Sequence, residues 1–485
     1  MTRTNTAIQQ PTAGDNLEAL FQPRSIAVVG ASANTRSQGY EYVEGLVKFG
    51  FPGPIYPVNP KLDELMGLKA YPRLEAIPGP VDFVISAVPA TAVFDLVEGA
   101  KAKGVKLIHF FTARFSETGR PDGAEAEREL REKTKAAGIR VIGPNCMGLY
   151  YPKRRITIDP MFLDEPGSVG FLSQSGSHAF RLIGRGRNRG LQFSKVISYG
   201  NALDLNEVDF LKHFADDPDT NVIAAYIEGI RDGQRFFEAL RYAAARKPVL
   251  VLKGGRTSAG HAAASSHTAS LASEQNIWNI AVRQAGALEM GSLNELTDML
   301  VAYECVGPAR GPRVAVLGGA GGGTVEAADL CAEAGLEMPP IPQTIRESLR
   351  ERLPYAWDWI GNPLDVSIMM GESNEMDILE MMAAHPIYDG IMLNFHVERA
   401  LHRLGVDRLP AEAIDRMKRL GTANGKALMM IVEEPESRDE SRLRGVLAAR
   451  DQMAAAGIAI YPSIERATQI MGRYVRYEAQ RRALG

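Results

Sequence analysis

The chain has 485 residues, which at a usual domain size of ~100–200 residues predicts about three domains, and 45% of them are hydrophobic, enough for sizeable cores. Its formal net charge of −3 at pH 7 argues against a nucleic-acid or membrane-surface partner, because neither would attract this chain by net charge. The three cysteines lie far apart in sequence, a pattern that predicts neither a disulfide framework nor a metal site.

The N-terminal stretch, residues 1–16, is polar and lacks the apolar segment of a signal peptide. No uninterrupted apolar run approaches the ~20 residues needed to span a bilayer. We therefore expect a flexible N-terminus and a cytoplasmic protein without a membrane partner.

The first predicted unit, residues 17–150, alternates short apolar runs with helical patterns. Apolar strands that alternate with helices predict a parallel sheet covered on both faces. Strands are expected at 25–30, 54–58, 81–88, 105–111 and 140–142, and helices at 91–103 and 123–137.

Two further units of the same plan follow, at 151–306 and 313–485, and a glycine- and proline-rich linker separates them at 307–312. The second unit has expected strands at 169–173, 194–198, 222–227 and 248–253, with helices from 174 and at 236–246. The third has expected strands at 313–319, 390–395, 426–432 and 458–461, with a helix at 324–334. The predicted fold class is α/β, with three doubly wound units.

The first strand ends in a glycine turn, Gly30-Ala31-Ser32-Ala33-Asn34, with Gly39 further on. It lies where a dinucleotide fold places its phosphate loop, but it lacks the G-x-G-x-x-G spacing, so a purely structural turn is an alternative. The second strand leads into Asn59 and Lys61, where an NAD-binding unit usually carries an acid. Lys61 would suit the phosphorylated ribose of coenzyme A or NADP, or it is a solvated surface lysine.

Two later turns also join a strand to a helix. Ser173-Gln174-Ser175-Gly176 places hydroxyls and a glycine at a helix N-terminus, which is either an anion site or an ordinary serine N-cap. The turn from Gly318 to Thr324 has five glycines in six positions, more than packing requires, because each glycine costs backbone entropy on folding. We expect an anion or phosphate site there.

His267 stands in a run of small residues, Ala264 to Ser273. A loop with so little side-chain bulk can pass close to a ligand or another subunit, so its imidazole could carry a group between two sites. The alternative is a flexible surface loop with an incidental histidine. Further along, Tyr355, Trp357 and Trp359 could line a bulky pocket, although such clusters are more often packing.

Taken together, these motifs resemble the α subunit of ADP-forming (NDP-forming) acyl-CoA synthetases, relatives of succinyl-CoA synthetase. The resemblance covers nearly the whole chain, from about Asn16 to Glu478. It is carried by Val28-Val29-Gly30-Ala31-Ser32, Ile55-Tyr56-Pro57-Val58-Asn59-Pro60-Lys61, Ile142-Gly143-Pro144-Asn145-Cys146, Ser173-Gln174-Ser175-Gly176, Ser265-Ser266-His267-Thr268 and Asn362-Pro363-Leu364-Asp365-Val366.

The resemblance implies a Rossmann-like CoA-binding domain followed by two flavodoxin-like CoA-ligase domains. It implies that His267 becomes phosphorylated, that Glu228 orients it, and that Ser173 to Gly176 hold the phosphate. The helix start at Gly321, Gly322, Gly323 and Thr324 would face the same phosphate. The coenzyme A site would comprise Gly30, Ala31, Ser32, Asn59, Lys61, Val88, Pro89, Asn145 and Cys146.

One position departs from the family pattern. The family usually has glycine directly after the His-Thr pair, and this chain has Ala269, whose methyl group puts the mobility of the loop in doubt. No stretch of the chain resembles the ATP-grasp module that such enzymes need for nucleotide and Mg²⁺. The resemblance therefore implies that a separate β subunit carries it, in an α₂β₂ assembly, with no metal site on this chain.

The expected activity is that of an acid–thiol ligase, which makes acyl-CoA from a small carboxylic acid, CoA and ATP through phosphohistidine and acyl-phosphate intermediates. A non-catalytic CoA- or acyl-CoA-binding regulatory protein is the main alternative. A third interpretation, an NADP-dependent dehydrogenase, is weakened by the missing G-x-G-x-x-G spacing.

Overall fold

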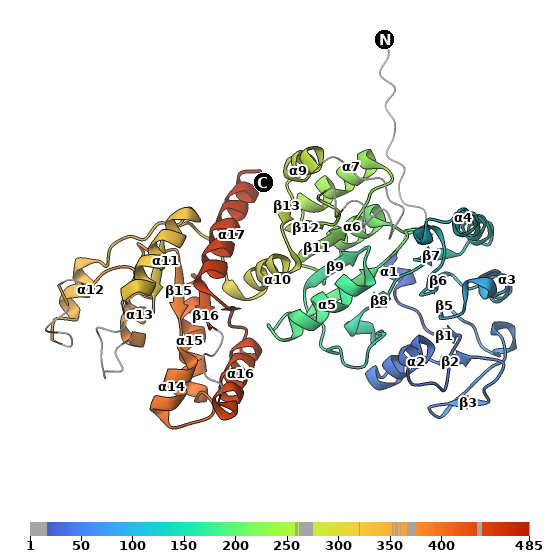
Figure 1. Cartoon of the computed structure of the whole chain (residues 1–485), viewed down its shortest axis with the longest axis horizontal. Coiled ribbons are helices and arrows are strands. Elements are labelled where there is room, and N and C mark those ends of the chain that lie inside the picture. Colours follow the sequence, from blue (N-terminus) through green and yellow to red (C-terminus); the bar gives the residue numbers. More distant parts are fainter. Residues whose placement is uncertain are drawn as a thin grey trace, which may run out of the picture. The chain divides into compact units, whose positions relative to one another are not determined.

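A computed structural model describes residues 17–257, 260, 275–319, 321–351, 354, 357–358, 360–365, 375–433 and 439–484 (Figure 1). These residues group into two compact units, 17–181 with 193–289, and 182–192 with 290–484. In this part of the chain no helix is both long and apolar enough to cross a bilayer, and no cluster of side chains could hold a metal ion. The predicted α/β class with parallel sheets is confirmed.

The first sheet is five-stranded and wholly parallel, in the order β2-β1-β5-β6-β7. Its strands are apolar and largely buried, as expected for a sheet covered on both faces. The chain runs outward from β1 to β2 and then returns to β5, so α2 covers one face while α3 and α4 cover the other. The elements are α1 (Leu17–Leu20), β1 (Ile26–Val29), α2 (Gln38–Phe49), β2 (Ile55–Val58), the hairpin β3 (Glu64–Leu65) and β4 (Leu68–Lys69), β5 (Phe83–Ser86), α3 (Val93–Lys103), β6 (Leu107–Phe110), α4 (Pro121–Ala136) and β7 (Arg140–Ile142).

The second sheet has six strands, in the order β13-β12-β11-β9-β10-β8. Neighbouring strands from β10 through β9 and β11 to β12 run parallel, and β8 pairs antiparallel with β10. Its elements are β8 (Gly148–Tyr150), β9 (Val169–Ser173), α5 (Gly176–Arg187), β10 (Phe193–Ser198), α6 (Glu207–Asp216), β11 (Val222–Ile227), α7 (Gly233–Ala244), β12 (Val249–Lys253), α9 (Gln275–Gln284) and β13 (Leu288–Met290).

The C-terminal unit carries a four-stranded parallel sheet, in the order β14-β15-β16-β17. The segment around Leu364 bonds to the free side of β14, since Leu364 donates to Val316 and Gly318 donates to Leu364. The elements are α10 (Leu293–Val301), a π-helix (Ala302–Val306), β14 (Val314–Leu317), α11 (Gly321–Glu333), α12 (Gln343–Ser348), α13 (Glu375–Ala384), β15 (Gly390–Asn394), α14 (Val397–Leu404), α15 (Ala411–Thr422), β16 (Ala427–Ile431), α16 (Glu440–Ala455), β17 (Ile460–Tyr461) and α17 (Ile464–Leu484).

The predicted strands match the observed ones, some with the same limits and most others with shortened ends. The strand expected at 313–319 ends at Leu317, because Gly318 and Gly319 take φ angles of +100° and +93°, outside the β region. The helix expected from 324 begins at Gly321, so three of the turn's glycines form its first turn. The short strands β3, β4, β8 and β13 and the long helix α17 were not predicted.

Two observations bear on the expected division at 150/151 and at 307–312. Strand β8 precedes residue 151 but hydrogen-bonds into the second sheet. Helix α10 groups with the C-terminal unit through buried Asp298, whose carboxylate accepts from Arg189 (2.9 Å) and from Arg466 (2.7 Å). Removing one partner of a buried ion pair is costly, so this cluster fixes α10 to the C-terminal unit.

Candidate functional site

The turn after β1 lies at the point where the first sheet reverses its strand order, between β1 and β5, which is where open α/β sheets bind ligands. Gly30 takes φ +91°, and a Cβ there would lie 2.7 Å from the Ala87 carbonyl oxygen. A Cβ at Gly39 would lie 2.1 Å from the Gly30 carbonyl oxygen, so the start of α2 packs directly on the turn. Close packing of the backbone around this turn therefore requires both glycines.

The other predicted residues of this edge divide into two groups. Asn59 supports the turn, because its Nδ2 donates to the Ala31 carbonyl (2.6 Å) and its Oδ1 accepts from the Lys61 amide (2.8 Å). Ser32 Oγ accepts from the Asn34 amide (3.1 Å). The side chain of Lys61 is exposed to solvent beside this turn. Asn59 therefore shapes the turn, and binding of a charged ligand by Lys61 stays a prediction.

The loop after β7 brings Asn145 and Cys146 to the same edge. Asn145 takes φ +58° after the cis peptide Gly143–Pro144, and its amide donates to the Thr112 carbonyl (2.9 Å). Tyr42 Oη on α2 donates to the Met147 carbonyl (2.9 Å). Cys146 is buried, and burial raises the pKa of its thiol, so the thiol is neutral and lines the site as an apolar group.

His109 on β6 supports the same loop from within the core. Its Nε2 donates to the Cys146 carbonyl (3.0 Å), and burial lowers the pKa of the ring to about 4. The neutral ring is therefore the form compatible with the folded loop. Gly148 packs against this ring so closely that a Cβ there would lie 2.4 Å from it.

We expect His109 to make the fold acid-sensitive. An unfolded histidine titrates near 6.5, so between pH 6.5 and about 4 the unfolded chain binds the extra proton, and stability falls as the pH falls through this window. The full effect is on the order of 3 kcal/mol. The measurement is the thermal midpoint against pH for the wild type and for His109→Asn, which keeps a donor but does not titrate.

His402→Asn is the matched control, because this histidine is exposed on α14. The curves of thermal midpoint against pH should coincide for the wild type and His402→Asn. His109→Asn should lose less stability than either between pH 6.5 and 4. A curve for His109→Asn that is parallel to the wild type would contradict the assignment.

The second predicted turn forms the N-terminus of α5, at the carboxyl end of β9. Ser173 is fully buried, and its Oγ donates to the Ser175 carbonyl (2.8 Å) and accepts from the Ser175 amide (3.2 Å). Ser175 Oγ accepts from the His178 amide (3.3 Å) and lies 3.0 Å from Ser177 Oγ. Two hydroxyls thus accompany the N–H groups of the first turn at the positive end of the α5 dipole, an arrangement suited to an anion.

Glu228 follows β11, the strand next to β9, where the second sheet reverses its strand order. Its backbone is clamped from both sides. Gln174 Oε1 accepts the amides of Glu228 and of Gly229 (2.9 Å for the latter), and Gln174 Nε2 donates to the Gly229 carbonyl (2.9 Å). Lys253 Nζ, at the end of β12, donates to the Glu228 carbonyl (2.6 Å) and to the Gly254 carbonyl (2.5 Å).

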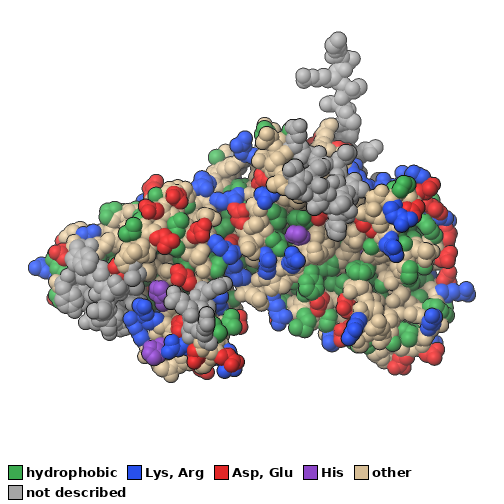
Figure 2. All heavy atoms as spheres, viewed as in Figure 1, with side chains coloured by type: hydrophobic (Ala, Val, Ile, Leu, Met, Phe, Trp, Pro, Cys, Tyr) green, Lys and Arg blue, Asp and Glu red, His purple; other side chains and the backbone are tan. Residues whose placement is uncertain are grey.

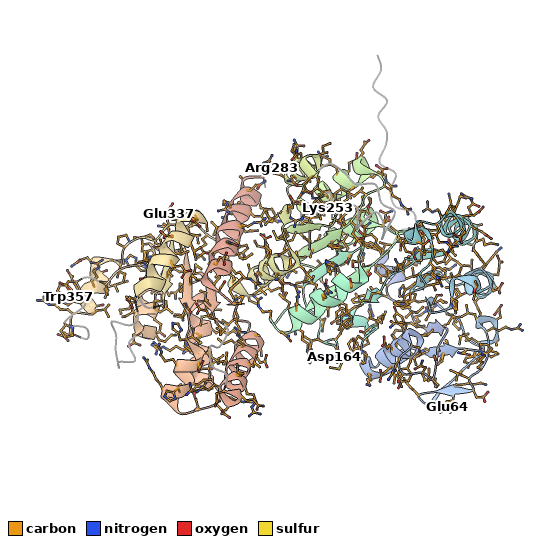
Figure 3. The ribbon with its side chains drawn as sticks, in the orientation of Figure 1. Glu64, Asp164, Lys253, Arg283, Glu337 and Trp357 are labelled. Atoms are coloured by element: carbon orange, nitrogen blue, oxygen red, sulfur yellow. The ribbon has the colours of Figure 1, made fainter. Side chains whose placement is uncertain are left out.

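Lys253 is 4% exposed and belongs to the same group of strand ends (Figure 3). Burial lowers its pKa, and the charge of Glu228 opposes that shift. Its ammonium also lies 5.6 Å from the centre of the Trp278 ring. A Cβ at Gly254 would lie 2.7 Å from Tyr226 Oη and 3.2 Å from Glu228 Cγ, so β12 leaves the sheet in tight contact with the clamp. Gln174 and Lys253 therefore fix the peptide that carries Glu228.

These strand ends enclose one cavity of about 800 Å³. A Cβ at Gly176 would lie 3.3 Å from the Met147 amide nitrogen, so the loop after β7 abuts the start of α5. Of the predicted residues, the cavity wall includes Val88, Pro89, Asn145, Cys146, Gln174, Ser175, Gly176 and Glu228. The carboxyl edge of the first sheet and the α5 terminus thus meet in a single chamber.

The third predicted turn, from Gly318 to Thr324, lies in the C-terminal unit. A Cβ at Gly318 would lie 2.2 Å from the Asn394 carbonyl oxygen, which explains that glycine. Among the described residues, a Cβ at Gly322 or Gly323 would meet nothing within 4 Å. Thr324 Oγ1 donates to the Gly321 carbonyl (2.8 Å). Phosphate binding at this helix start remains a prediction.

Several predicted features fall outside the described residues, namely His267, Ala269, Tyr355 and Trp359. Trp357 is described, and its ring packs against the core of the C-terminal unit with the Arg350 guanidinium 5.2 Å from its centre. This tryptophan is therefore packing, the alternative weighed against a pocket.

Sequence reasoning missed several residues of the chamber. Thr112 and its neighbours follow the parallel strand β6, and the rule that such strands end at one edge would have found them. Lys253 does not line the chamber but holds the Glu228 peptide, and a charged residue closing an apolar strand is a second available signal. The other lining residues missed are Gln38, Glu41, Ala87, Ala90, Phe111, Met147, Ile158, Asp159 and Phe180.

The comparisons with known proteins agree with this geometry. Residues 24–152 match a CoA binding domain, and residues 166–303 match a succinyl-CoA ligase-like flavodoxin domain. The α subunit of acetate–CoA ligase (ADP-forming) II of Pyrococcus furiosus is 35% identical over 395 residues, which cover 79% of this chain and 85% of the relative. The chain belongs to the α-subunit family of ADP-forming acyl-CoA synthetases.

Other family members extend the likeness. The α subunit of acetate–CoA ligase (ADP-forming) I of P. furiosus is 31% identical over 471 residues, which cover 95% of this chain and 98% of the relative. The acetate–CoA ligase (ADP-forming) I of Archaeoglobus fulgidus is 33% identical, and this chain spans 65% of its length. Among solved structures, the dinucleotide-forming acetyl-coenzyme A synthetase 1 of Ca. Korarchaeum cryptofilum, in complex with phosphate and ADP, superposes with a TM-score of 0.80 at 30% identity, over 96% of this chain and 98% of that one.

Proposed function

We propose that this chain is the α subunit of an acid–CoA ligase that makes acyl-CoA from a carboxylic acid, CoA and ATP through phosphohistidine and acyl-phosphate intermediates. The observation that carries the proposal is the single chamber, in which the edge of the CoA-binding domain meets the α5 helix start and Glu228 of the ligase domain. A domain that only bound CoA would not need the second set of groups.

The chamber suits the chemistry of the proposed reaction. A carboxylate is a poor electrophile toward a thiol, because its charge repels the nucleophile and oxide is a poor leaving group. Transfer of phosphoryl from His267 breaks its N–P bond and forms an O–P bond on the acid. The CoA sulfur then attacks the carbonyl, the C–S bond forms, and phosphate departs. The N–H groups of α5 and the hydroxyls of Ser175 and Ser177 are fixed in advance to stabilise the phosphoryl charge.

Coenzyme A fits the first sheet's edge. Gly30 and Gly39 let the backbone pack closely into the turn at this edge, and Lys61 stands exposed beside the turn for a phosphate group. Val88 and Pro89 lead from that edge into the chamber, so the thiol end would reach the α5 terminus. In this proposal Glu228 hydrogen-bonds the His267 ring, which fixes its tautomer and favours the protonated, then phosphorylated, imidazole.

We place ATP and Mg²⁺ on a partner subunit with an ATP-grasp module, in an α₂β₂ assembly. Two P. furiosus relatives bear the name subunit alpha, and the longer A. fulgidus relative extends beyond the part that this chain matches. Both facts support a division of the reaction between this chain and another catalytic module.

The reverse half-reaction tests the proposal on this chain alone. Acyl-CoA and radiolabelled inorganic phosphate give free CoA and acyl phosphate, and attack by His267 moves the phosphoryl group to nitrogen and releases the acid. We expect acid-labile label on the full chain, and no ADP release from ATP plus acid. Tight CoA binding without label for any thioester would favour a CoA-binding regulatory protein. Robust acyl-CoA synthesis by the chain alone would contradict the two-subunit proposal.

A further inference from the structure

One wall of the chamber is apolar and aromatic. Ser177 and Phe180 are three residues apart on α5, so they share a face of that helix. The Phe180 ring is 47% exposed and lies 5.1 Å from the ring of buried Phe162. Met147 and Ile158 extend the same wall. The apolar surface therefore begins at the helix start, where the carboxylate would react, and comprises Phe180 with Met147 and Ile158.

The size of the chamber also bears on the acid. Its volume of about 800 Å³ lies in the upper part of the range that buries a drug-sized ligand. The chamber would also hold the thiol end of CoA, and a two-carbon acid at the α5 terminus has only one methyl group to place against the Phe180 wall. Figure 2 shows hydrophobic side chains gathered on the visible face beside α5, with Lys and Arg side chains over the helix itself. A substrate that covers this aromatic surface would explain why the surface is exposed beside the reaction centre.

Two carboxylates line the same chamber, Glu41 on α2 and Asp159 after β8. Burial raises the pKa of Glu41, and the negative charge of Asp159 raises it further, because the two carboxylates repel each other. A second carboxylate on the substrate would add another negative charge to this pair. Arg114 also lines the chamber, but its side chain is exposed, and screening by solvent weakens such a charge.

We infer that the substrate is a monocarboxylic acid with an apolar body larger than that of acetate, and that Glu41 and Asp159 exclude dicarboxylic acids. The inference rests on the proposed function, since it names the acid for that same site. The Phe180 wall supplies the attraction for the apolar body, and the carboxylate pair supplies the repulsion that separates otherwise similar acids.

The test uses the full chain, radiolabelled inorganic phosphate and four thioesters: acetyl-, butyryl-, phenylacetyl- and succinyl-CoA. The readout is the rate of acid-labile labelling at equal thioester concentration. Butyryl- and phenylacetyl-CoA should exceed acetyl-CoA by on the order of tenfold, because each buried methylene is worth about fourfold. Succinyl-CoA should fall below butyryl-CoA by at least about tenfold.

Variants separate the two parts of the inference. Phe180→Ala should bring phenylacetyl-CoA down toward acetyl-CoA, and the double change Glu41→Gln with Asp159→Asn should raise the ratio of succinyl-CoA to butyryl-CoA. Glu44→Gln is the matched control, because this residue is one turn further along α2, pairs with Lys48 (2.9 Å) and does not line the chamber. Its ratios should equal those of the wild type.

The outcomes are distinct. Label from none of the thioesters overturns the proposed function itself. Label from all four at similar rates, with no effect of Phe180→Ala, overturns the apolar preference. Label from succinyl-CoA at or above the butyryl-CoA rate, lost on Arg114→Gln, overturns the exclusion and assigns the second carboxylate to that arginine.

Discussion

Replacing His267 with alanine is expected to abolish labelling of the chain, both from acyl-CoA with phosphate and from ATP in the presence of the partner subunit. No other group would accept the phosphoryl group in the proposed reaction, so the loss should be complete within detection. CoA affinity should be almost unchanged, because the proposed CoA site is built from the first sheet and the loop after β7. The measurements are acid-labile label on the chain and calorimetric CoA binding.

Histidine variants elsewhere make this result specific. The chain has eight histidines, and His402→Ala, on an exposed face of α14, should label like the wild type. Persistent label in His267→Ala would move the acceptor to His178. That ring stacks on Tyr226 at 4.1 Å, and its Nδ1 lies 3.2 Å from Ser175 Oγ at the α5 terminus.

The second large effect concerns Glu228 and its clamp. Glu228→Gln should slow labelling on the order of 10²-fold, because it keeps the shape but removes the charge that favours phosphohistidine. Lys253→Met should slow labelling by a comparable factor without touching the reacting atoms, since a shift of about 1 Å at a catalytic group can cost that much. It would leave the Glu228 and Gly254 carbonyls without their ammonium donor.

The pH profile distinguishes positioning from a general loss of stability. Lys253→Met removes a cation that interacts with Glu228, so the acid limb of the labelling rate should move to higher pH. Lys247→Met is the control, because Lys247 Nζ likewise donates to two carbonyls, Phe214 (2.7 Å) and Asp217, at the other end of β12. It should lower the thermal midpoint without moving the profile. Equal profiles for the two variants would assign Lys253 a structural role only.

Much of the fold was predictable because its strands are buried on both faces. Runs such as Val169–Ser173 and Val222–Ile227 are buried throughout and mostly apolar, and polar or turn residues bound them, so their limits coincide with the prediction. Strand β8 escaped because its three residues are too few to show a period and its pairing with β10 is antiparallel. The grouping of α10 with the C-terminal unit depends on Asp298 and its distant arginines, which no local pattern reveals.

The candidate site divides in the same way. The types of residue at the strand ends, from the glycines at 30 and 39 to Ser175 and Glu228, could be predicted because turn chemistry is local. The contacts that each residue makes depend on the packed fold. Gln174 was expected to hold phosphate, but its side-chain amide hydrogen-bonds the Glu228 and Gly229 peptides. The side-chain amide of Asn59 likewise donates to the Ala31 carbonyl in the turn. A side chain has few donors and acceptors, and strand order and packing choose which partners come within reach of them.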